Sequence, residues 1–171
     1  CAIAIKAVVG CQVVYRQKRL TKYGRVFEVY KFRTMKEENS IHKSVTENDD
    51  RITKVGKYLR KFRVDELPQL LNILKGDMTV VGPRPEMLEN VEKYKLQLPD
   101  FVYREKMKAG LTGYAQIEGK YNTTPEDKLM LDLMYIESFS IWLDIKLLFR
   151  TLPVFFRADS TAGFAAATYQ R

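Results

Sequence analysis

The spacing of apolar residues changes part-way along the chain, and this change constrains the fold more than any other feature. Apolar and polar side chains alternate in residues 12–17 and 26–32, with a glycine between the two segments, which predicts two strands joined by a hairpin loop. From Thr53 onward, apolar residues recur at helical intervals instead. The sequence therefore predicts one α+β domain that is mostly helical, with a small antiparallel β element near its start.

Prolines and glycines mark where several of the later elements begin and end. Pro68 fits only in the first turn of a helix that starts near Asp65 and is closed by Gly76. Further helices are expected at 86–98, 125–139 and 141–156, short strands at 78–81 and within 108–117, and an exposed loop at 35–50.

The length of 171 residues suits a single compact domain. We expect this domain to cover residues 1–157 and to be followed by a loose, low-complexity tail at 158–171. Residues 1–10 are apolar apart from Lys6, but they fall short of the roughly 18 to 20 apolar residues that span a bilayer. They fit either an ordinary buried segment or the end of something longer.

The net charge of +8 predicts an anionic partner, which could be nucleic acid, a phosphorylated small molecule or a membrane surface. Charge alone does not choose among these three. The two cysteines, Cys1 and Cys11, lie close together in the sequence and have no partners elsewhere, which excludes a disulfide framework. A single histidine, His42, excludes a His-rich metal site and disfavours a Ser-His-Asp triad.

Residues 141–156 are rich in aliphatic and aromatic side chains, with charged residues interspersed. Such a composition suits a helix that lies in a membrane interface with its charges toward water. A helix packed into the protein core explains the same residues, and the segment taken alone favours the core.

Asp65 and Glu66 are adjacent carboxylates near a predicted helix start. Helix capping would account for them, because backbone N–H groups there stabilise anions. Several cations precede the pair, however, and a carboxylate surrounded by cations is expected to keep a low pKa and to stay ionised as a nucleophile or metal ligand. Mg²⁺ held by these carboxylates and by substrate phosphates would complete a phosphoryl-transfer site.

Three other cations are placed where they could face an anion. Lys31 and Arg33 stand two residues apart at the end of the second predicted strand, so their side chains leave the same face. They could point at one anion, and an ordinary polar sheet face is an equally good interpretation. Arg84 lies between two prolines, which force a stiff, extended turn.

Six short motifs follow one another along the chain. They are Lys31-Phe-Arg-Thr-Met35, Asp50-Arg-Ile-Thr-Lys-Val-Gly-Lys-Tyr-Leu-Arg60, Asp65-Glu-Leu-Pro-Gln69, Leu74-Lys-Gly-Asp-Met78, Val81-Gly-Pro-Arg-Pro-Glu86 and Gly110-Leu-Thr-Gly113. In this order and spacing they resemble the bacterial sugar transferases, which are monotopic polyprenyl-phosphate phosphoglycosyl transferases. The resemblance covers almost the whole chain, and six motifs together are specific where any one would be weak.

The resemblance implies transfer of a sugar 1-phosphate from a UDP-sugar to undecaprenyl (polyprenyl) phosphate, with release of UMP and with Mg²⁺ as cofactor. It implies a ping-pong reaction through a covalent phosphosugar–aspartate intermediate, as the first membrane step of exopolysaccharide, capsule, O-antigen or glycoprotein glycan assembly. It places the protein at the cytoplasmic face of the bacterial inner membrane, against an anionic lipid surface and attached by an N-terminal re-entrant helix. With the resemblance, the interfacial interpretation of residues 141–156 becomes the favoured one.

The resemblance also implies roles for individual residues. Asp65 would be the nucleophile and Glu66 would support Mg²⁺ binding, so both are expected as catalytic residues and metal ligands. Binding of substrate and phosphate groups is expected of Lys31, Arg33, Arg60, Arg84, Lys120 and Asp144.

Two residues depart from the family pattern. Ala109 stands where the family commonly has a proline before the glycine, and Lys120 stands where many members have an arginine, which removes a two-pronged hydrogen-bonding group. A nucleic-acid-binding module would explain the charge equally well. No recognised nucleic-acid motif occurs, so no specific nucleic acid is expected as a partner.

Overall fold

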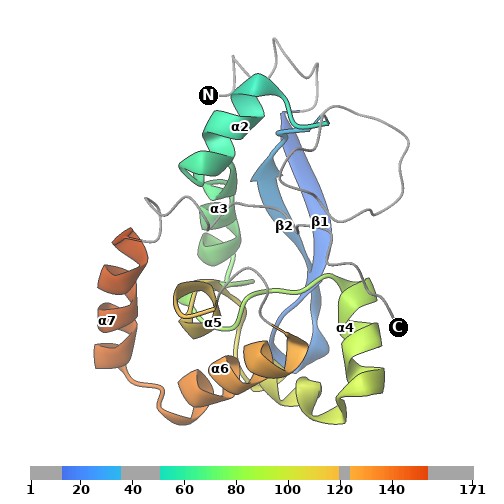
Figure 1. Cartoon of the computed structure of the whole chain (residues 1–171), viewed down its shortest axis with the longest axis vertical. Coiled ribbons are helices and arrows are strands. Elements are labelled where there is room, and N and C mark those ends of the chain that lie inside the picture. The colour runs from blue at the N-terminus through green and yellow to red at the C-terminus, as the bar shows by residue number, and fades with distance from the viewer. Residues whose placement is uncertain (1–12, 36–50, 120–123, 154–171) are drawn as a thin grey trace, which may run out of the picture.

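The computed structural model describes residues 13–35, 51–119 and 124–153 (Figure 1). Within these ranges it confirms the predicted α+β fold, which is mostly helical. The expectations for residues 1–10, the loop at 36–50, Lys120 and the tail at 158–171 lie outside the described residues. In chain order the elements are β1 (Val14–Leu20), η1 (Lys22–Gly24), β2 (Val26–Phe32), α2 (Lys54–Lys61), η2 (Val64–Glu66), α3 (Gln69–Leu74), β3 (Thr79–Val81), α4 (Leu88–Gln97), η3 (Pro99–Lys106), β4 (Gly110–Thr112), α5 (Tyr114–Ile117), α6 (Pro125–Glu137) and α7 (Ile141–Thr151).

β1 and β2 form an antiparallel hairpin that is paired along its whole length. The short connection η1 places Tyr23 and Gly24 at positive φ, which glycine adopts without strain. β2 has the predicted bounds, whereas β1 continues beyond the predicted end to Leu20. The charged residues Lys18 and Arg19 interrupt the apolar alternation, and for this reason the sequence pattern ends the strand too early.

β3 and β4 form a second, parallel pair whose existence the sequence pattern does not reveal. Thr79 pairs with Gly110, and Val81 pairs with Thr112. A Cβ atom on Gly110, the first residue of β4, would collide with the backbone of Gly82, the residue after β3. These two segments therefore approach closely only because glycine is present. This close approach places the residues that follow β3 directly beside those that precede β4.

The buried apolar residues form three clusters around the two sheets. One cluster joins β3 to the helices α5, α6 and α7, a second lies between β2 and the segments that precede β3 and β4, and a third is formed by α4, η3 and α6. The hairpin contacts α3 on one side and α4 on the other, as Figure 1 shows. The hairpin and the three clusters therefore form the framework that carries the helices.

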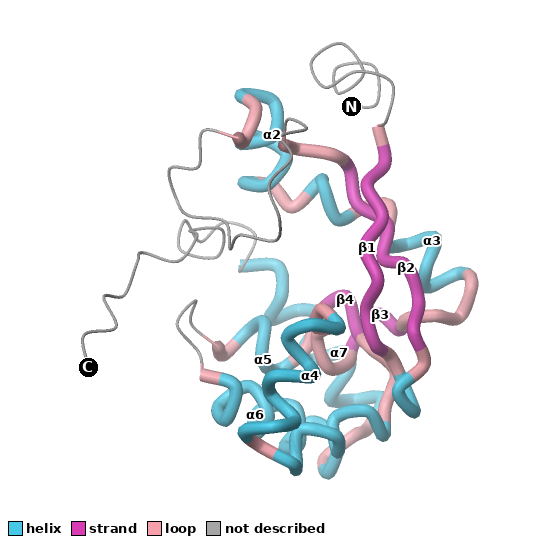
Figure 2. The backbone as a smooth tube through the Cα atoms, turned by 90° about the vertical axis from the view of Figure 1, so that its right-hand side faces the viewer, coloured by secondary structure: helices cyan, strands magenta, loops and turns pink. Residues whose placement is uncertain are grey.

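α3 lies beside β2 (Figure 2) and turns polar side chains toward it, while Ile73 is the apolar residue of α3 that packs against the cluster containing β2 residues. Gln69 and Asn72 are buried, whereas Leu70, Leu71 and Leu74 are exposed. The Asn72 amide accepts a hydrogen bond from the Tyr30 backbone and donates one to the Glu28 carbonyl, at 3.1 and 2.7 Å. These bonds satisfy β2 backbone groups that face the helix, so a polar residue is required at the centre of this contact.

α7 has two apolar faces. Leu147 is completely buried in the cluster with β3, which confirms the core interpretation for one face. Trp142 and Phe149 lie on another face and are 81% and 69% exposed. Within the described part of the chain, no helix combines the length and the hydropathy needed to cross a bilayer.

Candidate active site

Asp65 and Glu66 lie in η2, a single 3-10 turn between α2 and α3. Arg63, directly before the turn, has a left-handed conformation with φ of 51°, and this conformation redirects the chain after α2. α3 begins only at Gln69, after Pro68. The helix expected to start near Asp65 therefore starts at Gln69, and the two carboxylates precede it in the separate turn η2 and do not form its first turn.

Glu66 is surrounded by cations from three different elements. Its Oε1 atom lies 2.9 Å from Lys31 Nζ and 3.3 Å from Arg84 Nη2, and its Oε2 atom lies 3.7 Å from Arg63 Nη1. Burial alone would raise the pKa of Glu66, but the three positive charges outweigh burial and hold this pKa well below its ordinary value. Glu66 is therefore a permanently ionised anchor that fixes three cations.

Asp65 has the opposite electrostatic environment. Burial raises its pKa, the negative charge of Glu66 raises it further, and the charges of Lys31 and Arg60 only partly oppose this rise. Among the described residues, Asp65 forms no salt bridge, because the neighbouring ion pairs are made by Glu66. The prediction of a low pKa is therefore wrong for Asp65, although it is correct for Glu66.

Lys31, Arg60 and Arg84 are brought to this cluster as predicted. Lys31 and Arg84 reach Glu66 directly, and the Arg60 charge acts on Asp65 while its Nε atom donates to Thr34 Oγ1 at 2.9 Å. In the described part of the structure, no ion pair joins Arg33 to either carboxylate.

Arg19 belongs to the cluster although no motif indicates it. Its Nη1 atom donates to the Pro85 carbonyl at 3.1 Å, and Arg19, Lys31, Glu66 and Arg84 line one small pocket. Burial, together with the charge of Arg84, lowers the pKa of Arg19 to about 10. The hairpin register contains the missing signal, since it places Arg19 on the same face as Lys31 once β1 is extended to Leu20.

Asp144 is held by a separate contact. The Tyr135 hydroxyl donates to Asp144 Oδ1 at 2.8 Å, and burial together with this bond raises the pKa of Tyr135. Among the described contacts none connects Asp144 to Glu66, so its expected role in substrate binding stays a prediction.

Asp65 is the better placed of the two carboxylates to hold a metal ion. Both oxygens of Glu66 already face cations, whereas Asp65 is not engaged in a salt bridge within the described residues. No group of three or more His, Cys, Asp or Glu side chains that could hold a metal ion occurs in the described ranges. This donor set fits Mg²⁺ in its usual mode, with one or two carboxylates and the remaining ligands from substrate phosphates and water.

Positive charge exceeds negative charge at the site. The five cations Arg19, Lys31, Arg60, Arg63 and Arg84 lie around three carboxylates, those of Asp65, Glu66 and the neighbouring Glu86. Such an excess around a partly buried carboxylate suits an anionic ligand with several oxygens, such as a diphosphate. The fold and the excess of positive charge at the site thus fit the class of proteins that bind phosphorylated ligands.

Comparison with known proteins agrees with this class. The sequence matches the family described as bacterial sugar transferase over residues 1–158. The chain therefore belongs to the bacterial sugar transferase family.

Three curated relatives differ in the sugar that their names specify. The chain is 39% identical over 156 residues to the UDP-N-acetylgalactosamine-undecaprenyl-phosphate N-acetylgalactosaminephosphotransferase of Aeromonas hydrophila, with 88% of the chain and 37% of that relative covered. It is 40% identical over 158 residues to the UDP-glucose:undecaprenyl-phosphate glucose-1-phosphate transferase of Escherichia coli K12, with 88% and 34% covered. It is 36% identical over 167 residues to the undecaprenyl-phosphate galactose phosphotransferase of Salmonella typhimurium, with 88% and 34% covered. The match thus spans little more than a third of these relatives.

Proposed function

We propose that this chain transfers a sugar 1-phosphate from a UDP-sugar to undecaprenyl phosphate and releases UMP. The observation that carries the proposal is the pair Asp65–Glu66, in which one carboxylate is neutralised by cations and the other is left available beside them. The names of the relatives, which specify this type of donor and acceptor, support the same reaction.

The proposed first step forms a covalent intermediate at Asp65. A carboxylate oxygen of Asp65 attacks the phosphorus that bears the sugar, the bond from that phosphorus to the bridging oxygen breaks, and the electron pair leaves with UMP. The raised pKa of Asp65 makes its ionised carboxylate a stronger base and hence a better nucleophile.

In the proposed second step, a phosphate oxygen of undecaprenyl phosphate attacks the same phosphorus. The bond to the Asp65 oxygen breaks, and the carboxylate is restored without net uptake or release of a proton. The product carries the sugar on a diphosphate, and the enzyme returns to its starting form. Two successive displacements at one phosphorus amount to a ping-pong reaction.

The surrounding cations would stabilise the charge that spreads over the transferred phosphoryl group. Lys31 and Arg84 are fixed beside Asp65 by Glu66 before any substrate binds, so little reorganisation is needed. When a diphosphate enters, these two cations can exchange their bonds to Glu66 for bonds to phosphate oxygens. Such an exchange would free one oxygen of Glu66.

Mg²⁺ is the proposed cofactor. Asp65 would hold it together with substrate phosphate oxygens, and Glu66 would become a second ligand when both Lys31 and Arg84 move to the phosphate. When bound, the ion would neutralise charge on the diphosphate and on the departing UMP.

We place the reaction at the cytoplasmic face of the bacterial inner membrane, where an undecaprenyl carrier and a soluble nucleotide can meet. The exposed apolar faces of α3 and α7 support this location, because exposed leucine and tryptophan side chains next to cations suit an anionic lipid surface. The charge is equally available to nucleic acid, and the lack of a specific nucleic-acid partner stays a prediction.

The decisive experiment follows UMP release by the complete protein in detergent with Mg²⁺, undecaprenyl phosphate and a panel of UDP-sugars. The wild type should release UMP from one donor, and Asp65→Asn should lower the rate by at least about 10³-fold, as removal of a nucleophile does. Lys95→Gln, which breaks an ion pair with Glu105 and leaves the ion pairs of Glu66 in place, is the matched control and should keep the wild-type rate.

Two outcomes would overturn the proposal. One is the absence of UMP release from every donor, and the other is equal release by wild type and Asp65→Asn. Mass spectrometry after mixing with donor alone should detect a phosphosugar adduct on the peptide that contains Asp65. The same panel identifies the sugar, on which the three relatives disagree.

A further inference from the structure

The turn that carries Arg84 is fixed through its backbone carbonyl groups. Neither proline of the turn can donate a backbone hydrogen bond, so the carbonyls are its means of attachment. All three carbonyls accept a hydrogen bond from a separate donor, two of them from guanidinium groups. The pairs are Pro83 O with Gly110 N at 2.8 Å, Arg84 O with Arg104 Nη2 at 2.8 Å, and Pro85 O with Arg19 Nη1 at 3.1 Å.

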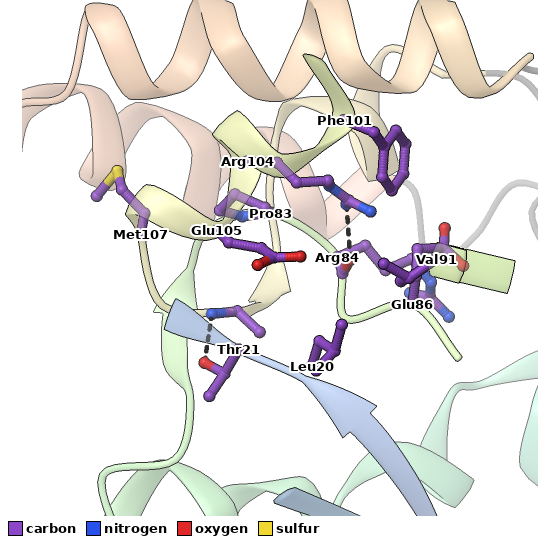
Figure 3. Close-up of a pocket in the computed structure, with 11 residues that line it drawn as sticks. Leu20, Thr21, Pro83, Arg84, Glu86, Val91, Phe101, Arg104, Glu105 and Met107 are labelled. Atoms are coloured by element: carbon purple, nitrogen blue, oxygen red, sulfur yellow. Dashed lines mark hydrogen bonds between the residues drawn. The ribbon is translucent and has the colours of Figure 1, made fainter. Parts of the chain in front are cut away.

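Arg104 is itself held in place by Asp132 and Phe101. Its Nη2 atom forms an ion pair with Asp132 Oδ2 at 2.6 Å, and its guanidinium group lies 4.7 Å from the centre of the buried Phe101 ring. The side chains of Arg104 and Asp132 are 6% and 2% exposed. Figure 3 shows Arg104 directed from η3 toward the Arg84 carbonyl, with Phe101 beside it.

Burial of this ion pair is unfavourable in free energy compared with burial of apolar side chains. Two charges removed from water lose hydration energy that their mutual attraction repays only in part, and apolar residues of similar size would pack there at lower cost. Within the described residues, a hydrogen bond from Arg104 to the Arg84 carbonyl connects this ion pair to the candidate site. The other end of Arg84 is the guanidinium group that reaches Glu66 at 3.3 Å.

We propose that Arg104 and Asp132 are positioning residues that hold Arg84 at the nucleophile. Asp132, on α6, orients Arg104; Arg104 fixes the Arg84 carbonyl; and the fixed backbone aims the Arg84 side chain at Glu66 and at the substrate phosphates. The inference deepens the proposed function and rests on it for the identity of the bound phosphate. Neither residue touches the reacting atoms.

A double-mutant cycle separates positioning from general stabilisation of the fold. Asp132→Asn keeps the size of the side chain and removes its charge, and it is measured in the wild-type and in the Arg84→Ala background. If Asp132 acts through Arg84, Asp132→Asn should lower kcat/KM by about 10²-fold in the wild type, the effect of a misplacement near 1 Å. In the Arg84→Ala background the same change should lower kcat/KM less than about threefold, because the group it positions is gone.

Arg104→Lys provides a second variant that retains the positive charge. The lysine side chain is shorter, so its ammonium group should not reach the position of Arg104 Nη2, which contacts both Asp132 and the Arg84 carbonyl, and Arg104→Lys should show the same dependence on Arg84. Glu105→Gln, a neighbour in η3 whose ion pair is with Lys95, should leave kcat/KM unchanged in both backgrounds. Equal losses from Asp132→Asn in both backgrounds would overturn the proposal, and so would full activity of both variants.

Failure of the proposed function is recognised separately, because the wild type would then release UMP from no donor. In that case calorimetry in the presence of Mg²⁺ measures the affinity of each variant of the same double-mutant cycle for inorganic pyrophosphate. A loss of affinity that depends on Arg84 would support the positioning role. A loss that is the same with and without Arg84 would overturn it.

Discussion

At the residue scale, Asp65 and Glu66 are adjacent in the chain, yet their pKa values are shifted in opposite directions. Glu66 lies within reach of Lys31, Arg84 and Arg63, and their charges overcome the effect of burial. Asp65 experiences burial and the negative charge of Glu66 with less compensation. The pair therefore divides two tasks, since Glu66 holds cations at every physiological pH while Asp65 can gain a proton.

This difference predicts the pH dependence of the reaction. In the proposed mechanism only ionised Asp65 can attack, so the rate should fall as the pH is lowered through the raised pKa of Asp65. Glu66→Gln removes a charge that raises this pKa, and the acidic limb of the profile of log(kcat/KM) against pH should therefore move to lower pH. The maximum rate should fall in the same variant, because Lys31 and Arg84 lose their anchor.

The control for this titration is Glu118→Gln. Glu118 pairs with Arg150 at the surface, so the variant removes the same charge from a place outside the cluster. Its acidic limb should coincide with that of the wild type. An acidic limb that stays in place in Glu66→Gln would contradict the assignment to Asp65.

Part of the candidate site could be predicted from sequence alone. Lys31, Arg60 and Arg84 stand in motifs, and the structure brings them to the two carboxylates. Arg19 could not be found this way, because its place depends on the hairpin register and on the Pro85 carbonyl, which is distant in sequence. The pKa of Asp65 was predicted wrongly, because a list of nearby cations does not say which carboxylate they pair with.

At the element scale, α3 places its polar side against the hairpin. Asn72 bonds to two β2 backbone groups, whereas Leu74 is 83% exposed. Asn72→Ala would leave the Tyr30 N–H and the Glu28 carbonyl without this partner in the interior, at about 1–3 kcal/mol for each unsatisfied group. Urea denaturation should therefore show a clear loss of stability for Asn72→Ala.

Leu74→Ala is the matched control on the same helix. A leucine that is exposed in the folded chain gains little from folding. The free energy of unfolding of this variant should therefore lie within about 0.5 kcal/mol of the wild-type value. If Leu74→Ala lost more stability than Asn72→Ala, α3 would pack with its leucines inward, contrary to the structure.

Elements that depend on interactions between neighbouring residues were predicted correctly, whereas pairings between distant segments were not. β2 and the helix from Thr53 were correct because alternation and a capping threonine act locally, and Thr53 Oγ1 indeed accepts from Gly56 N at 2.9 Å. The pairing of β3 with β4 is parallel and joins segments about thirty residues apart, so no local pattern specifies it. The side of α3 that faces inward was equally hidden, because its leucines have an ordinary helical period.

At the scale of the whole molecule, exposed apolar side chains and a positive net charge occur together. We expect the protein to bind anionic vesicles through them, and Trp142→Ser combined with Phe149→Ser should weaken this binding. Pelleting with vesicles that contain anionic lipid measures the effect, and neutral vesicles should bind less in every variant. Tyr103→Ser, an exposed aromatic of η3, is the control and should bind as the wild type does.

The position of α3 has a kinetic consequence on such a surface. Its exposed leucines begin within a few residues of Asp65, so in the proposed reaction a carrier lipid would meet the proposed nucleophile without leaving the bilayer, while the nucleotide would arrive from water. The second displacement would then depend on the number of carrier molecules per unit area and not per unit volume. Adding inert lipid at constant carrier and enzyme would slow that step by surface dilution and leave the first displacement unchanged.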